Sequence, residues 1–255
     1  MTLPAVIEDA RTSGARVLVL SPHLDDAVLS CGALLGSLGG CEITVLTLFT
    51  ACTAGPHTRA ARSFLRQCSH PDAATLFTAR RDEDRDVVER LGARPEHAGH
   101  ADALFRRRDV PEAVGRVLPE LAHRYPTYRF DIARGRISGG DRALRAGLAR
   151  DLAERAGEVD LLLAPLGVGR HVDHLITRDL GAEWTRTPVV HYADFPYSLT
   201  HEPDPTFVRR AGLRPHVVDD GLDAKEQLIR GYRTQVDALF PDGVVPRAPE
   251  TYWAA

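Results

Sequence analysis

The sequence has no long hydrophobic run, few cysteines and no marked excess of either charge. No apolar stretch approaches the roughly 20 residues that a membrane-spanning helix needs. The first residues include acids and lack an apolar core, which is not typical of a signal peptide. The four cysteines form no CxxC pair and no disulfide framework, so we expect reduced thiols. Together these absences predict a cytoplasmic protein.

Charge is nearly balanced, with 32 basic and 35 acidic residues and a formal net charge of −3. The longest basic run, Arg106–Arg108, is too short to form a binding arm. We therefore expect no nucleic-acid partner and no membrane partner. The sequence holds no signal that predicts an oligomeric state.

What the chain does contain is an alternation of strand and helix patterns over 255 residues, 44% of them hydrophobic. Strands are expected at 16–20, 41–49, 161–166 and 188–192, and helices at 4–12, 27–38, 80–91, 111–124, 141–156 and 222–239. Loops are expected at 50–78 and, facing the substrate, at 125–140; the segment 96–108 is ambiguous, with a short strand as one interpretation. This order predicts a Rossmann-like α/β fold, with a mainly parallel twisted sheet flanked by helices. Since no linker or repeat divides the chain, we expect a single domain over residues 1–255.

Two clusters of ionisable side chains each follow a predicted buried strand. The first is HLDD at 23–26 and the second is HVDH at 171–174. Because the carboxyl ends of parallel strands lie at one edge of a sheet, we expect the two turns to meet there. Ionisable groups beside a hydrophobic strand are costly to bury without compensation, and a metal ion would provide it.

These residue types suit a catalytic metal site. Catalytic zinc takes three protein ligands and leaves a position open for water. One His and one Asp from the first turn and one His from the second would satisfy that number. A carboxylate and an imidazole then remain to take a proton and to face an oxyanion.

Three other interpretations stay open. Taken alone, HLDD is compatible with a turn and a helix cap, and HxxH with two histidines on the surface of a helix. The presence of both clusters, each at a strand end, weakens this structural interpretation. A two-His-one-carboxylate iron site of an oxygenase uses the same ligand types, but the β/α alternation does not indicate the β-barrel usual for such enzymes. A non-catalytic binding relative is disfavoured because every expected catalytic residue type is present.

The sequence resembles the PIG-L/LmbE-like family of metal-dependent de-N-acetylases, which includes deacetylases of GPI-anchor, mycothiol and bacillithiol biosynthesis. The family signature PHxDD stands at 22–26 and HxDH at 171–174. Two weaker elements also match: R-x-x-E at 80–83, in a helix ending in LG at 91–92, and Y-x-T-Q at 232–235. The matches follow the family's order along nearly the whole chain.

The resemblance implies a role for each residue of the two clusters. His23, Asp26 and His174 would be the metal ligands. Asp25 would be the general base, and His171 the imidazolium that stabilises the tetrahedral oxyanion.

Residues around the clusters receive roles by the same resemblance. Asp173 would orient a neighbouring His, while Arg80 and Asp102 would contact the substrate sugar. The implied cofactor is Zn²⁺, with Fe²⁺ as the alternative. The implied substrate is a small N-acyl amino sugar or its conjugate, with another N-acyl or thiol-conjugate metabolite as the alternative.

Overall fold

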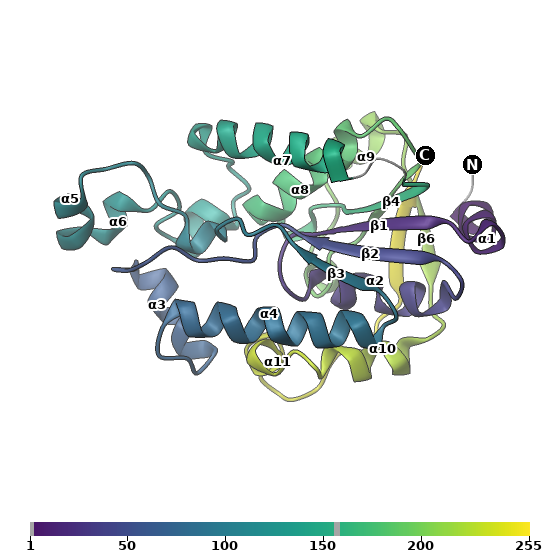
Figure 1. The fold of residues 1–255 in the computed structure, drawn as a ribbon, viewed down its shortest axis with the longest axis horizontal. Helices are drawn as coiled ribbons and strands as arrows, with labels where there is room; N and C mark the ends of the chain where they lie inside the picture. The colour runs from purple at the N-terminus through teal and green to yellow at the C-terminus, as the bar shows by residue number, and fades with distance from the viewer. Residues whose placement is uncertain (1–2, 156–158) are drawn as a thin grey trace.

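The apolar runs of the sequence form the centre of one seven-stranded sheet (Figure 1). A computed structural model describes residues 3–155 and 159–255. The strand order is β3-β2-β1-β4-β5-β7-β6. The strands are β1 (Arg16–Ser21), β2 (Glu42–Thr47), β3 (Arg94–His97), β4 (Leu161–Pro165), β5 (Val189–Tyr192), β6 (Arg214–Val218) and β7 (Glu250–Ala254).

The sheet is mainly parallel, as predicted. Strands β1 to β5 pair in parallel, and β7 lies antiparallel between β5 and β6. Strands β6 and β7 were not predicted, and β3 begins two residues before the ambiguous segment 96–108. The α/β, Rossmann-like fold is confirmed; that the domain extends over all of residues 1–255 stays a prediction.

Helices cover both faces of the sheet (Figure 1). One face packs on α1, α2, α4 and α10, and the other on α7 and α8. The helices are α1 (Leu3–Ser13), α2 (Asp26–Ser37), α3 (Arg59–Gln67), α4 (Ala73–Arg90), α5 (Glu112–Val117), α6 (Pro119–Ala122), α7 (Arg142–Arg155), α8 (Val172–Glu183), α9 (Pro205–Arg210), α10 (Leu222–Ile229) and α11 (Arg233–Leu239). Residue 156, the predicted end of α7, lies outside the described residues.

Three predicted segments are wrong in detail. The predicted loop 50–78 contains α3 and the start of α4, which are capped by the side chains of Thr58 and Asp72. The predicted helix 111–124 breaks before Pro119, which lacks an amide hydrogen. The predicted helix 222–239 breaks near Gly231, where a Cβ would lie 2.2 Å from the Arg90 guanidinium of α4.

A cluster of short turns follows the carboxyl ends of the strands. They are η1 (Ala103–Phe105), η2 (Tyr128–Ile132, within the predicted loop 125–140), η3 (Gly139–Asp141), η4 (Val168–Arg170) and η5 (Tyr197–Leu199). No helix in the two described ranges is both long and apolar enough to cross a membrane.

Candidate active site

The structure brings the HLDD and HVDH turns together at the carboxyl ends of β1 and β4. The first turn leads from β1 into α2, and the second opens α8. The centroids of the His23 and His171 rings are 4.8 Å apart, and those of His23 and His174 are 5.2 Å apart. All eight predicted site residues are buried, namely His23, Asp25, Asp26, Arg80, Asp102, His171, Asp173 and His174.

His174 lies between two carboxylates. Its Nδ1 lies 2.6 Å from the buried carboxylate of Asp194, to which it donates. Its Nε2 is buried without a hydrogen-bond partner, although it lies 3.3 Å from Asp26 Oδ2. Burial lowers the pKa of His174, but Asp26 and Asp194 outweigh burial and raise that pKa. The site therefore favours a positive charge here, carried either by a proton on Nε2 or by a cation that the neutral ring and Asp26 both bind.

His23 also lies between carboxylates, with an acidic side chain near each ring nitrogen. Its Nε2 is 3.3 Å from Asp173 Oδ2 and 3.7 Å from Asp102 Oδ2, while its Nδ1 is 3.0 Å from Asp26 Oδ2. Burial lowers the pKa of His23, but hydrogen bonds to Asp173 and Asp26 outweigh it and raise that pKa well above its ordinary value. The surroundings therefore favour a positive charge at this point.

The residues present fit a divalent metal ion. When Nε2–H of His23 donates to Asp173, its Nδ1 presents a lone pair beside Asp26 Oδ2. His23, His171 and His174 also offer nitrogen atoms within 4.8 Å of one another, and His23, Asp102 and Asp173 form a second such group. Nitrogen and carboxylate ligands of this kind suit zinc or ferrous iron.

His171 is placed as a donor. The backbone N–H of Asp173 donates to His171 Nδ1 at 3.2 Å, so the proton of a neutral ring resides on Nε2. Burial, and then the neighbouring His23 and His174, hold the pKa of His171 well below its ordinary value. The neutral imidazole is thus the favoured form here, and the imidazolium role stays a prediction.

Asp25 has the character of a proton acceptor. It is buried next to the HLDD metal-ligand candidates, and its Oδ2 lies 3.6 Å from Arg80 Nη2. Burial raises the pKa of Asp25 to about 6, with Arg80 opposing and Asp26 adding to the rise. A carboxylate whose pKa lies nearer to neutrality accepts a proton more readily than an ordinary aspartate does.

Arg80 is positioned by two aromatic rings, with its guanidinium 6.0 Å from the Phe64 ring centre and 5.4 Å from that of Phe77. Its Nε is buried and has no hydrogen-bond partner among the described residues. A polar group of a ligand is the kind of partner that this nitrogen lacks.

Behind His23 lies a buried network of charges that the sequence did not reveal. Asp173 accepts hydrogen bonds from Arg106 Nη2 at 2.6 Å and from Ala103 N at 2.8 Å. Arg106 Nη1 also binds Asp141 at 2.9 Å, and Asp141 accepts from Tyr125 Oη. Arg106 belongs to a short basic run, and nothing local to that run indicates its buried role.

A cavity of about 550 Å³ opens onto this site and includes Asp25, Arg80, Asp102 and His171 in its lining. Side chains of α3, α11 and the two loops near Tyr128 and Tyr197 complete the wall. Tyr128 belongs to the segment 125–140, which the sequence predicted to face the substrate, whereas the α3 residues were not identified from the sequence. The α3 residues at 60, 63, 64 and 67 lie on one face of that helix.

The two weaker sequence elements hold part of this wall in place. The Glu83 carboxylate on α4 accepts from Thr234 N at 3.1 Å and from Thr234 Oγ1 at 2.7 Å. Tyr232 Oη donates to Asp84 at 3.1 Å. These bonds dock the start of α11 on α4, which places Gln235 on the cavity wall.

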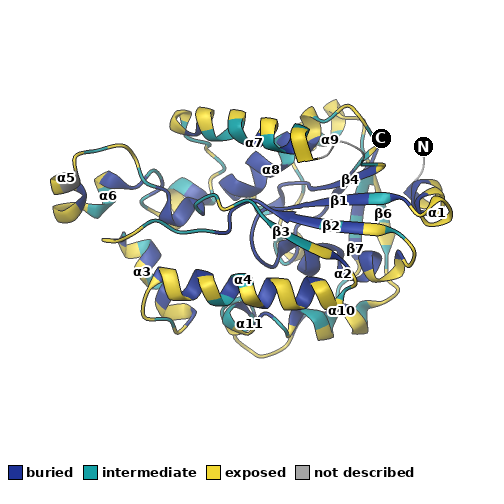
Figure 2. Cartoon of the chain, viewed as in Figure 1, coloured by how far each residue is buried: buried dark blue, intermediate teal, exposed yellow. Residues whose placement is uncertain are grey.

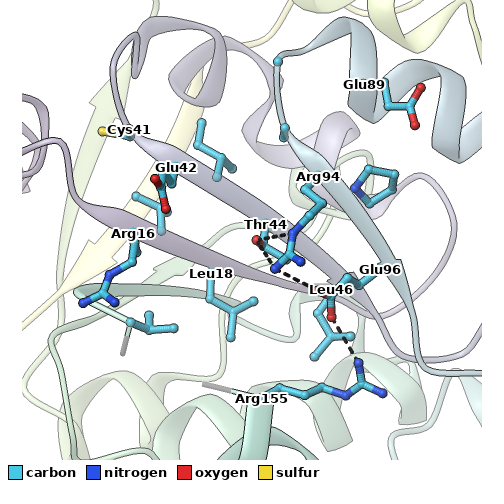
Figure 3. Close-up of a pocket in the computed structure, with 16 residues that line it drawn as sticks. Arg16, Leu18, Cys41, Glu42, Thr44, Leu46, Glu89, Arg94, Glu96 and Arg155 are labelled. Carbon is cyan, nitrogen blue, oxygen red and sulfur yellow. Dashed lines mark hydrogen bonds and ion pairs between the residues drawn. The ribbon is translucent and has the colours of Figure 1, made fainter. Parts of the chain in front are cut away.

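A second cavity, of about 920 Å³, lies at the amino ends of β1, β2 and β3 (Figure 3). It contains none of the predicted site residues. Two of its arginines pair with Glu96, which lies 2.9 Å from Arg94 and 3.1 Å from Arg155. We place the candidate active site in the smaller cavity, where the buried ionisable groups gather.

Comparison with known proteins agrees with this placement. Residues 18–185 match the profile of the family described as PIG-L, GlcNAc-PI de-N-acetylase. The 2'-N-acetylparomamine deacetylase of Streptomyces fradiae is 30% identical over 238 residues, covering 89% of this chain and 76% of that protein. The 1D-myo-inositol 2-acetamido-2-deoxy-alpha-D-glucopyranoside deacetylase of Corynebacterium glutamicum is 29% identical over 170 residues, or 66% of this chain. The chain spans about half the length of that second relative, 52%.

Solved structures show the same fold. A deacetylase–teicoplanin complex has a TM-score of 0.72 at 24% identity, covering 94% of this chain and 97% of that chain. The A40926 pseudoaglycone deacetylase has a TM-score of 0.64 at 26% identity, covering 94% of this chain and 96% of that chain. With a family profile matched over most of the sequence and both signature motifs in one buried site, this chain belongs to the PIG-L family of de-N-acetylases.

Proposed function

We propose that this protein is a metal-dependent hydrolase that removes an N-acetyl group from a small amino-sugar substrate. The observation that carries the proposal is the buried approach of His174 Nε2, which has no hydrogen-bond partner, to Asp26 Oδ2 at 3.3 Å, with Asp25 next to them. The two curated relatives are named as deacetylases of acetamido sugars, which supports the substrate class. Zinc is the proposed ion, and ferrous iron is the alternative.

His23 Nδ1, Asp26 Oδ2 and His174 Nε2 would hold the ion. When bound, it would supply Lewis acidity, which polarises the acyl carbonyl and lowers the pKa of a water. Asp25 takes the proton of the water as the water oxygen bonds to the acyl carbon. The proposed contribution of His171 is its Nε2–H, which donates to the carbonyl oxygen as negative charge develops there.

The second half of the reaction breaks the carbon–nitrogen bond. The leaving nitrogen keeps the electron pair and takes a proton, giving an amine and acetate; the proton comes from Asp25 or through His171. We propose that Arg80 and Asp102 hold the sugar hydroxyl groups, since both line the cavity. Asp173 would fix the orientation of His23.

The test separates proton transfer from metal binding. Acetate release would be measured on a panel of N-acetyl amino sugars and their conjugates, with the metal content of each variant determined in parallel. We expect Asp25→Asn to keep the metal and to lose about 10²–10⁴ in kcat. His174→Ala should lose the metal itself.

Two outcomes would contradict the proposal. Asp25→Asn with bound metal and unchanged turnover would remove the assigned base. Release of acetate by fully chelated protein at the original rate would remove the metal from the mechanism.

A further inference from the structure

A hairpin of two short helices, α5 and α6, projects from one end of the molecule (Figure 1). Its large apolar side chains are Val114 and Val117 on α5, Leu118 between the two helices and Leu121 on α6. Aliphatic side chains of this size are mostly buried in folded proteins. Here the exposed fractions are 38% for Val114, 76% for Val117, 50% for Leu118 and 56% for Leu121. The four side chains therefore face solvent, and α5 is largely exposed in Figure 2.

Arginines lie beside these four apolar side chains. The neighbouring helix α3 carries exposed arginines at 59, 62 and 66, and residues 59–66 contain no acid. The backbone N–H of Arg59 donates to the Glu120 side chain of α6 at 3.2 Å, which joins the two elements. Arg107 lies against α5, with its Nη2 at 2.2 Å from the place that a Cβ on Gly115 would take.

The charge of this end differs from that of the whole chain. Residues 59–66 and 106–124 together contain eight arginines and three acids, whereas the chain has a formal net charge of −3. Of the arginines, Arg106 is buried, and those at 59, 62, 66, 108 and 116 are exposed. A basic surface with aliphatic side chains at its tip is therefore concentrated at one end of a nearly neutral protein.

The combination of exposed arginines and exposed aliphatic side chains favours one kind of binding partner. A second copy bound symmetrically through the same face would place the arginines opposite their own copies, which is unfavourable. Nucleic acid offers phosphates but little to cover four aliphatic side chains. The surface of an anionic bilayer offers both phosphates and an apolar boundary a few ångströms below them.

We propose that the α5–α6 hairpin and the arginine face of α3 bind reversibly to the surface of an anionic phospholipid membrane. An adjacent face of α3, at residues 60, 63, 64 and 67, lines the active-site cavity. Membrane contact would therefore bring the mouth of that cavity close to the lipid surface. This inference is independent of the proposed reaction, and it revises the expectation of no membrane partner that the net charge suggested.

The test is co-sedimentation with vesicles of phosphatidylcholine alone and of phosphatidylcholine mixed with phosphatidylglycerol. Binding is expected only to the mixed vesicles, and it should weaken as salt is added. Deacetylation of a water-soluble N-acetyl amino sugar, measured separately without lipid, reports on the proposed reaction.

Matched variants separate a specific surface from a general charge effect. Val117→Asp with Leu121→Asp should reduce vesicle binding by about tenfold or more, because both side chains would enter the apolar boundary. The control pair is Val217→Asp with Val244→Asp, which changes the net charge equally at side chains that are 65% and 66% exposed elsewhere. This control should retain most of the binding.

A second pair of variants tests the arginines. Arg59→Gln with Arg62→Gln should weaken binding about 25-fold. Arg209→Gln with Arg210→Gln removes the same charge from α9 and should have a much smaller effect.

The proposal is overturned if the wild-type protein does not co-sediment with anionic vesicles. It is overturned as well if each pair of control variants loses as much vesicle binding as the pair that it controls. It is also overturned if Val117→Asp with Leu121→Asp dissociates an oligomer of the lipid-free protein, since the hairpin would then be a contact between copies. Circular dichroism spectra confirm that each variant is folded.

Discussion

Replacing Arg106 with Met would show how strongly the buried charges behind His23 depend on one side chain. Arg106 bridges Asp173 at 2.6 Å and Asp141 at 2.9 Å, and both carboxylates are fully buried. Removing one partner of a buried ion pair costs about 3–5 kcal/mol, since the remaining charge is left uncompensated. Asp141 keeps Arg124 and Tyr125 as partners, whereas the carboxylate of Asp173 keeps Ala103 N and His23 as its hydrogen-bond partners among the described residues. We therefore expect most of the loss at Asp173.

The assay is urea unfolding of Arg106→Met beside a matched control, Arg230→Met. Arg230 makes an ion pair of similar length, 2.7 Å, with Glu226 on the surface of α10, and that pair is partly exposed. The control should cost only about 0.5 kcal/mol. Arg106→Lys should fall between the two, because an ammonium group keeps the charge but cannot bridge both acids in a fork.

Zinc binding gives an independent readout of the same change. Without Arg106, the Asp173 side chain is held less firmly. If Asp173 orients His23, Arg106→Met should therefore weaken zinc affinity about 10–100-fold. The reasoning fails if Arg106→Met is no more destabilising than Arg230→Met. It also fails for the site if zinc affinity is unchanged although stability falls.

Three further changes test other contacts. Asp194→Asn removes the charged partner of His174 Nδ1, 2.6 Å away, and should lower zinc affinity about 10–100-fold with an unchanged circular dichroism spectrum; equal affinity would contradict it. Gly181→Ala would place a Cβ 2.4 Å from Ala164 Cβ and should cost about 1–3 kcal/mol. Gly147→Ala in α7, with nothing within 4 Å, should gain about 0.5–1 kcal/mol; thermal shifts of the same sign would refute this pair. Thr234→Val removes the 2.7 Å hydrogen bond to Glu83 and should cost about 2 kcal/mol in urea unfolding; no change would mean that this contact does not dock α11.

The parts of the fold that were predicted correctly are those that local sequence determines. Strands β1 and β4 are apolar on both faces, so each appears as a continuous hydrophobic run. The turns after them carry the ionisable clusters, and parallel pairing brings the two turns together. One general rule about parallel sheets was enough to join two distant motifs into one site.

The missed elements depend on contacts that the sequence does not display. In α3 only Ala61 and Leu65 are buried, because the helix packs over the cavity rather than on the sheet. Strand β7 pairs antiparallel between β5 and β6, and only this pairing identifies the run Glu250–Ala254 as part of the sheet. The break at Gly231 is likewise imposed by the close approach of α4.

The site was predicted as a set of ligand candidates, but the proton positions of those ligands depend on residues outside the motifs. Burial raises the pKa of Asp173, yet Arg106, His23 and His171 together outweigh burial and hold that pKa well below its ordinary value. Ionised Asp173 accepts the Nε2–H of His23, which leaves Nδ1 of His23 free to bind a cation. Asp194 likewise accepts the Nδ1–H of His174, which leaves Nε2 of that ring to bind the cation. A chain with both motifs but without these two partners would have the ligands and lack their fixed tautomers.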